Sequence, residues 1–220
     1  MLRSEPLSAA LLTGEFAVAT GRLSAAEAAI ARRSVRSYTD QPVTDDEVRD
    51  LIELTGRAPS AFNLQPWRFI VVRDQEVKDA VRAAAFNQKQ VGEAPVLLAM
   101  YADMEDTMAH LEEIVHPGLD AEKREGTLAM LRNNFGNMTP EARGAWANGQ
   151  ANIALGYLLL IARSEGFATS PMLGFDAAKV KTILDIPETA TVTALVAIGR
   201  GADEGFESHR HTVERVAVFR

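Results

Sequence analysis

Three arginines and a serine stand within one short run, Arg32-Arg33-Ser34-Val35-Arg36. A guanidinium group offers paired N–H donors and a permanent positive charge, and this combination suits phosphate oxygens. The run therefore indicates an anion site. A solvated basic surface is the alternative, because arginine is frequent in this chain.

Two further stretches place side-chain amides in expected loops. Residues 58–67 are stiffened by two prolines and offer Ser60, Asn63 and Gln65 as hydrogen-bonding groups. Residues 86–90 read Phe-Asn-Gln-Lys-Gln at the end of an expected helix. Amides donate and accept at once, so they suit the edge of a flat heterocycle. The alternatives are a tight connection between helix and strand for the first stretch and a polar helix end for the second.

A fourth stretch, Ser170-Pro171-Met172-Leu173-Gly174-Phe175, follows an expected strand. A proline followed by a glycine lets the backbone come close to a planar group. An ordinary turn between strand and helix is the alternative.

The absence of cysteine and of several catalytic motifs excludes whole classes of functional site. The 220 residues include no cysteine, which excludes disulfides, thiolate nucleophiles, iron–sulfur clusters and cysteine-bound zinc. No G-x-G-x-x-G, P-loop, G-x-S-x-G or H-E-x-x-H motif occurs. His209 and His211 could face one way on a strand, but no metal site is expected there. Redox chemistry would need an organic cofactor.

The net charge of −7 argues against a nucleic-acid partner, which requires a broad positive surface. No segment has the apolar length of a membrane span, so no membrane partner is expected. Residues 9–19 come nearest, but Glu15 interrupts them and no strong basic region precedes them, unlike a signal peptide. We expect a helical N-terminal arm here and a cytoplasmic protein.

Apolar spacing and capping residues predict helices over 28–33, 48–57, 74–86, 140–164 and 176–184, with Gly166 as a helix stop. Short apolar runs predict strands over 69–72, 95–101 and 191–198, and residues 168–172 are a further strand candidate. The alternating stretch 212–219 is a candidate edge strand. Residues 103–137 show helical spacing broken by Pro117-Gly118 and stay undecided. Interleaved helices and few strands indicate an α+β or α/β class.

In this order and spacing, the four stretches resemble the FMN-dependent nitroreductase family, and most closely its bacterial NAD(P)H nitroreductase subgroup. The resemblance covers residues 24–218. It implies an α+β fold with a central, mainly antiparallel sheet flanked by helices, and an intertwined homodimer with two FMN molecules at the interface. Residues 24–220 would form one domain after an arm of residues 1–23. The tail would extend the partner's sheet, and the long helix around Leu155 would form a dimer face.

Carried over residue by residue, the resemblance implies a flavin site. Arg32, Ser34 and Arg210 would bind the FMN phosphate. Arg36, with Arg33 alongside, would lie near the N1 and O2 edge of the ring. Asn87 would hydrogen-bond the pyrimidine edge, and Gln150 would touch the ribityl chain. The ring would be covered from the partner by Pro59, Ser60, Ala61 and Asn63. It would lie against Pro171, Met172, Leu173 and Gly174, with a backbone N–H of this segment near N5.

The chain departs from the family pattern at two places. Some members carry glutamate where Leu173 stands, so an acidic hydrogen-bonding partner is missing here. Some members carry lysine where Ser208 stands, and Arg33 is the residue that could compensate at the phosphate.

The resemblance implies an FMN-dependent NAD(P)H oxidoreductase that reduces nitroaromatics, quinones or similar acceptors by ping-pong hydride transfer. Arg36 and Gly174 would tune the flavin, and no side-chain nucleophile is needed. Residues 103–137, Phe62, Phe86 and Phe135 are candidate substrate walls, although core packing explains an aromatic side chain more often. The alternatives are a flavin carrier or sensor without turnover, and a flavin-fragmenting or dehalogenating enzyme on the same fold. Neither the physiological acceptor nor a preference between NADH and NADPH follows from these residues.

Overall fold

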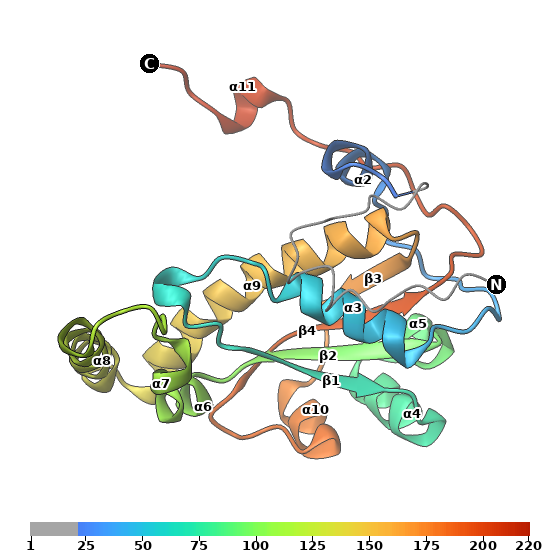
Figure 1. Ribbon diagram of the computed structural model, residues 1–220. Helices are drawn as coiled ribbons and strands as arrows, with labels where there is room; N and C mark the ends of the chain where they lie inside the picture. The colour runs from blue at the N-terminus through green and yellow to red at the C-terminus, as the bar shows by residue number, and fades with distance from the viewer. Residues whose placement is uncertain (1–21) are drawn as a thin grey trace, which may run out of the picture.

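The structure, a computed structural model, describes residues 22–220 and centres on a four-stranded sheet (Figure 1). The strands are β1 (Trp67–Val72), β2 (Val96–Ala102), β3 (Ala168–Met172) and β4 (Thr191–Gly199). They lie in the order β1-β2-β4-β3, and every neighbouring pair is antiparallel. This sheet confirms the expected α+β class, and each strand overlaps a range that the sequence predicted.

The two central strands are apolar at nearly every position. β2 reads Val-Leu-Leu-Ala-Met-Tyr-Ala and is buried except for half-buried Tyr101. β4 is buried along its length after Thr191. A strand covered on both faces has no polar side, so its sequence runs apolar without alternation.

Helices cover both faces of the sheet (Figure 1). On one face, α9 (Pro140–Ser164) packs against α3 (Asp45–Thr55). α2 (Ala25–Ala31) also packs against α9. The other face is covered by α4 (Gln75–Ala84), α5 (Lys89–Glu93) and α10 (Ala177–Leu184). Leu98 of β2 belongs to the first core and Leu97 to the second. The sheet thus separates two apolar cores.

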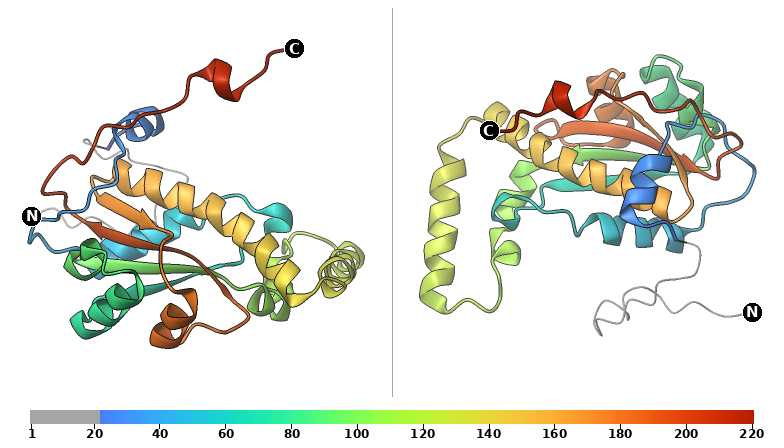
Figure 2. Two further views of the ribbon diagram at one scale, coloured as in Figure 1. Left: turned by 180° about the vertical axis from the view of Figure 1, so that it is seen from behind. Right: turned by 90° about the horizontal axis from the view of Figure 1, so that it is seen from above.

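The undecided region forms three helices. α6 (Met104–Ala109) and α7 (Leu111–Ile114) follow β2, and α8 (Ala121–Gly136) stands out from the rest of the chain (Figure 2). The Pro117-Gly118 break separates α7 from α8. Leu128, Leu131 and Phe135 are buried and attach α8 to the core.

Predicted caps are found at the helix ends. Ser24 with Glu27 and Thr44 with Glu47 form complete capping boxes. Thr139 caps α9, whose first residue is Pro140. Beyond the other end of α9, Gly166 takes a left-handed φ of 80°. A cap depends on a few neighbouring residues, which is why the sequence alone reveals it.

Three helices end earlier than the apolar spacing predicted. α2 ends at Ala31 and not at 33, because Arg32 turns to an extended backbone. α4 ends at Ala84 and not at 86, where Phe86 is already left-handed. α3 ends at Thr55 and not at 57. Among the residues left out of the first two helices, Arg32, Arg33 and Phe86 belong to predicted site stretches.

The predicted edge strand over 212–219 is wrong for a single copy of the chain. α11 (Val213–Val216) forms one helical turn instead, and the tail leads away from the domain (Figure 1). Strand hydrogen bonds need a neighbouring sheet edge, and within residues 22–220 the tail pairs with none. Of the predicted arm 1–23, only residues 22 and 23 are described, and Leu23 N–H donates to the Ser164 carbonyl at 3.3 Å.

Candidate active site

The basic segment 32–36 lies along the outer edge of β3. Val35 N–H donates to the Thr169 carbonyl at 3.0 Å, and Ser34 pairs with Thr169 in a parallel bridge. Arg32 stands where the chain leaves α2 for this extended run. The turn out of the helix brings the arginines to one edge of the sheet.

Arg32 is the residue best prepared to bind an anion. Its Nη1 is buried and has no hydrogen-bond partner within residues 22–220. Burial lowers its pKa, and the neighbouring charges of Arg210 and Arg33 lower that pKa further. A positive charge held out of water beside two others is unfavourable, so a bound anion would be strongly stabilised there. The C-terminal segment passes beside α2, after which Arg32 follows (Figure 1).

Arg32 lines a cavity of about 500 Å³. Arg163 at the end of α9 and Arg200 after β4 line it too. The Nε atoms of both are buried without a partner in the described part of the chain, although Arg200 Nη2 pairs with Glu47 at 2.6 Å. Neither arginine is among the predicted site residues, because no local motif surrounds either of them.

The loop after β4 crosses the basic segment at Gly205. A Cβ at this glycine would lie 3.1 Å from the Ser34 carbonyl oxygen and 3.2 Å from Arg33 Cβ. Gly205 also has a left-handed φ of 67°. Only glycine suits both the close approach and the left-handed φ. The crossing directs the following C-terminal segment, which includes Arg210, along the basic segment.

Residues 86–90 and 171–174 come together next to β3. Gln88 Nε2 donates to the Gly174 carbonyl at 2.8 Å, and Gln90 Nε2 lies 3.3 Å from Met172 Sδ. Phe86 and Leu173 are 71% and 70% exposed. Apolar surface beside amide groups is what a flat, partly polar ring could cover. Neither glutamine was among the predicted site residues, because both fit equally well as a polar helix end.

Left-handed backbone is concentrated in the two amide loops. Of the six such non-glycine residues within residues 22–220, five lie there: Phe62, Asn63, Gln65, Phe86 and Asn87. This backbone costs about 1–2 kcal/mol per residue, so surrounding contacts must hold it. Strain of this kind gathers at functional sites.

The loop 58–65 lies at the opposite edge of the sheet, before β1. Its short helix η1 (Ala61–Asn63) contacts α9, where Ala61 N–H donates to Gln150 Oε1 at 2.9 Å. β1 and β3 are the two outer strands. In one copy of the chain this group therefore lies apart from the basic segment (Figure 1). Its predicted members are Pro59, Ser60, Ala61, Asn63 and Gln150.

A model of the nitroreductase family matches residues 29–200. The chain is also 50% identical over 198 residues to the NADH dehydrogenase of Thermus thermophilus, covering 90% of this chain and 97% of that protein. The chain belongs to the nitroreductase family.

Other nitroreductases match along nearly the whole chain. YdgI of Bacillus subtilis, provisionally named an NAD(P)H nitroreductase, is 29% identical over 86% of this chain and 94% of its own. A provisionally named nitroreductase of Exiguobacterium sibiricum, solved in complex with FMN, has a TM-score of 0.82 at 27% identity. That match covers 90% of this chain and 98% of the other. The expected resemblance and nitroreductase-like fold are confirmed.

Within residues 22–220, this nitroreductase shows no group of three or more histidine, cysteine or acidic residues that could hold a metal ion. In the same range, every helix is too short or too polar to cross a membrane.

Proposed function

We propose that this nitroreductase is an FMN-dependent NAD(P)H oxidoreductase that acts in the cytoplasm as a homodimer and reduces nitroaromatics, quinones or similar acceptors. The main support is the half-buried Arg32, whose Nη1 atom is buried without a hydrogen-bond partner in residues 22–220 and whose pKa is lowered in part by the charge of Arg210. A phosphate dianion satisfies such a pair with charge-assisted hydrogen bonds. The FMN complex of a relative supports the assignment.

The residues present fit FMN at both ends. Arg32, Arg33, Ser34 and Arg210 would hold the phosphate. Arg36, Asn87 and the segment 171–174 would border the ring. A Cβ placed at Gly174 would meet nothing closer than 3.8 Å, so the chain leaves space for a ring to approach the backbone there.

Bound FMN would supply the redox step, accepting a hydride from NAD(P)H and then reducing the acceptor. The chain would contribute charge and shape. Arg36 is exposed and would place a positive charge where the reduced ring becomes negative. Phe86 and Leu173 would exclude water from the ring. Donor and acceptor would use one site in turn, so we expect ping-pong kinetics.

A second copy of the chain would complete this site. The loop 58–65 and Gln150 lie across the sheet from Arg32 in one copy, so they would cover the partner's flavin. The exposed side of α9 supports such a dimer: Gly149, Ile153 and Gly156 are exposed at helical spacing, and a Cβ at either glycine would meet nothing within 4 Å. Leu155 itself is buried within the chain, so the dimer face is centred on Ile153.

The tail also has a surface to occupy on another copy. A groove of about 890 Å³ lies beside the edge strand β1 and is lined largely by apolar side chains, among them Val48, Ile52, Ile70 and Val71. The tail exposes Val213, Val216, Val218 and Phe219. An unpaired strand edge accepts an added strand. Residues 24–220 would thus form one domain with an exchanged tail, preceded by the arm 1–23.

Steady-state kinetics would test this function. Rates would be measured with NADH and with NADPH against a panel of nitroaromatic and quinone acceptors. Parallel double-reciprocal lines would support ping-pong reduction. An FMN-loaded protein that oxidises neither nucleotide would overturn the reductase proposal and favour a flavin carrier.

A further inference from the structure

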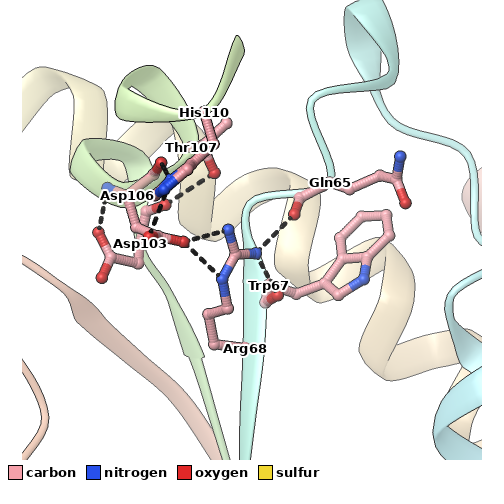
Figure 3. A network of polar contacts seen from close by, with 7 residues as sticks. All are labelled: Gln65, Trp67, Arg68, Asp103, Asp106, Thr107 and His110. Carbon is pink, nitrogen blue, oxygen red and sulfur yellow. Dashed lines mark hydrogen bonds and ion pairs between the residues drawn. The ribbon is translucent and has the colours of Figure 1, made fainter. Parts of the chain in front are cut away.

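A charged cluster outside the predicted flavin site holds the end of the loop 58–67 (Figure 3). Arg68 Nε donates to Asp106 Oδ2 at 2.8 Å, and Nη2 pairs with the same oxygen. Its Nη1 donates to the carbonyls of Gln65 at 3.0 Å and Trp67 at 2.8 Å. Every nitrogen of this guanidinium group is therefore engaged.

The acidic side of the cluster is tied to the same loop. Asp103 N–H donates to the Pro66 carbonyl at 2.8 Å, and Asp106 N–H donates to Asp103 Oδ1 at 3.0 Å. Thr107 Oγ1 donates to the Asp103 carbonyl at 2.9 Å. The first turn of α6 thus holds both the loop backbone and the carboxylate that receives Arg68.

The loop requires this support because its backbone is strained. Phe62, Asn63 and Gln65 have φ values of 57°, 58° and 43°. The Gln65 carbonyl is an acceptor for Arg68, while Gln65 N–H donates to Ser60 Oγ at 3.0 Å. A chain of hydrogen bonds therefore runs from Arg68 through Gln65 to Ser60, which directly precedes η1.

We propose that Arg68, oriented by Asp106, is a positioning residue that keeps Ser60–Gln65 in the shape needed over the partner's flavin. The role rests on the proposed function, in which this loop covers that flavin. Arg68 acts only through the loop backbone. Lysine would keep the charge but lacks the planar fork that serves one carboxylate and two carbonyls together.

Hydrogen–deuterium exchange on the FMN-loaded protein tests this role in Arg68→Lys and in Asp106→Asn. The matched control is Arg132→Lys, which alters the Arg132–Glu112 pair at 2.5 Å between α8 and α7, where no residue of the loop takes part. We expect amide exchange of residues 61–65 to rise at least fivefold in both test variants. Exchange in β2 should stay at the wild-type rate, and the control should match the wild type in residues 61–65 and in β2.

Kinetics separate positioning from a merely structural role. Arg68→Lys is expected to raise the KM of the acceptor at least fivefold while kcat changes less than twofold. Unchanged exchange in 61–65, or an equal rise in β2, would overturn the proposal, as would an unchanged KM. If the wild-type protein neither binds FMN nor oxidises NAD(P)H, the proposed function fails. The exchange measurement on the flavin-free protein then still decides whether Arg68 holds the loop.

Discussion

Gln88 is hydrogen-bonded to Gly174 across 86 positions of sequence, with Nε2 at 2.8 Å from the glycine carbonyl. The bond joins the loop after α4 to the turn after β3, and these are two of the stretches expected to border the flavin. It leaves the exposed side chains of Phe86 and Leu173 in one region of the surface. The hydrogen bond thus joins the two stretches that are proposed to face the ring into a single unit.

Replacing Gln88 should loosen this unit. Gln88→Ala is expected to weaken FMN binding about two- to tenfold, because a neutral hydrogen bond contributes about 0.5–1.5 kcal/mol. Fluorescence titration of the apoprotein would measure the change. Gln41→Ala removes an exposed amide whose side chain makes no hydrogen bond in the described residues. If both variants bind FMN equally well, the bond has no part in the site.

Arg32 should discriminate between flavins with and without a phosphate. Arg32→Met is expected to weaken FMN binding about 10- to 100-fold, since a hydrogen bond to a charged group contributes about 1.5–3 kcal/mol. Binding of riboflavin, which lacks the phosphate, should not change. The melting temperature of the apoprotein should stay equal or rise, because the variant no longer buries an uncompensated charge. Equal losses for FMN and riboflavin would contradict a phosphate role, and Arg132→Met serves as the control.

The α9 face should determine the oligomeric state. Ile153→Arg places a charge on the exposed apolar face and is expected to convert dimers to monomers that lose FMN on dialysis. Light scattering after gel filtration would measure the mass. Glu76→Arg, an exposed residue of α4 on the other side of the sheet, should stay dimeric. A dimer that survives Ile153→Arg would place the interface elsewhere.

His110 should make stability depend on pH. Its Nδ1 lies 2.8 Å from the Asp106 carbonyl oxygen, and this hydrogen bond, with the Asp106 charge, raises its pKa. Folding thus favours the protonated ring. The contribution of His110 to the free energy of unfolding is complete below the pKa of about 6.5 in the unfolded chain. It is lost as pH rises through the higher pKa of the folded protein. Because the ring is exposed, we expect the effect to be small.

Urea unfolding at pH 5.5 and pH 9 would measure this contribution. The free energy of unfolding of wild type minus that of His110→Gln should be larger at pH 5.5. If the wild type and His110→Gln differ in free energy of unfolding by the same amount at both pH values, the contact with Asp106 does not favour the charged ring.

Local signals made much of the fold predictable. Ser24, Thr44 and Thr139 cap helices where their side chains predicted, because a cap involves only residues within one turn. β1, β2 and β4 were recognisable from apolar runs, whereas β3 reads Ala-Thr-Ser-Pro-Met and was only a candidate. The path of 212–219 was not predictable. Val216 and Val218 are two positions apart, as in a strand, while Val213 and Val216 are three apart, as in a helical turn, so a neighbouring sheet edge decides between the two.

The site was predictable only where one stretch carries its own residues. The Arg32–Arg36 run stands out as a candidate anion site, and the amide loops as candidate polar sites, from their own residues. The bond from Gln88 to Gly174, the approach of Arg210 to Arg32, and the cluster around Arg68 join residues far apart in sequence. Such contacts depend on packing between elements, which spacing along one element does not reveal.

The proposed function requires that this nitroreductase binds FMN and passes reducing equivalents from NAD(P)H through it. The most direct test is anaerobic addition of NADH or NADPH to the FMN-reconstituted protein, followed by flavin absorbance. We expect a yellow protein that bleaches with at least one nucleotide and regains its colour when a quinone or nitroaromatic is added. A flavin that stays oxidised with both nucleotides, or a protein that cannot be reconstituted with FMN, would contradict it.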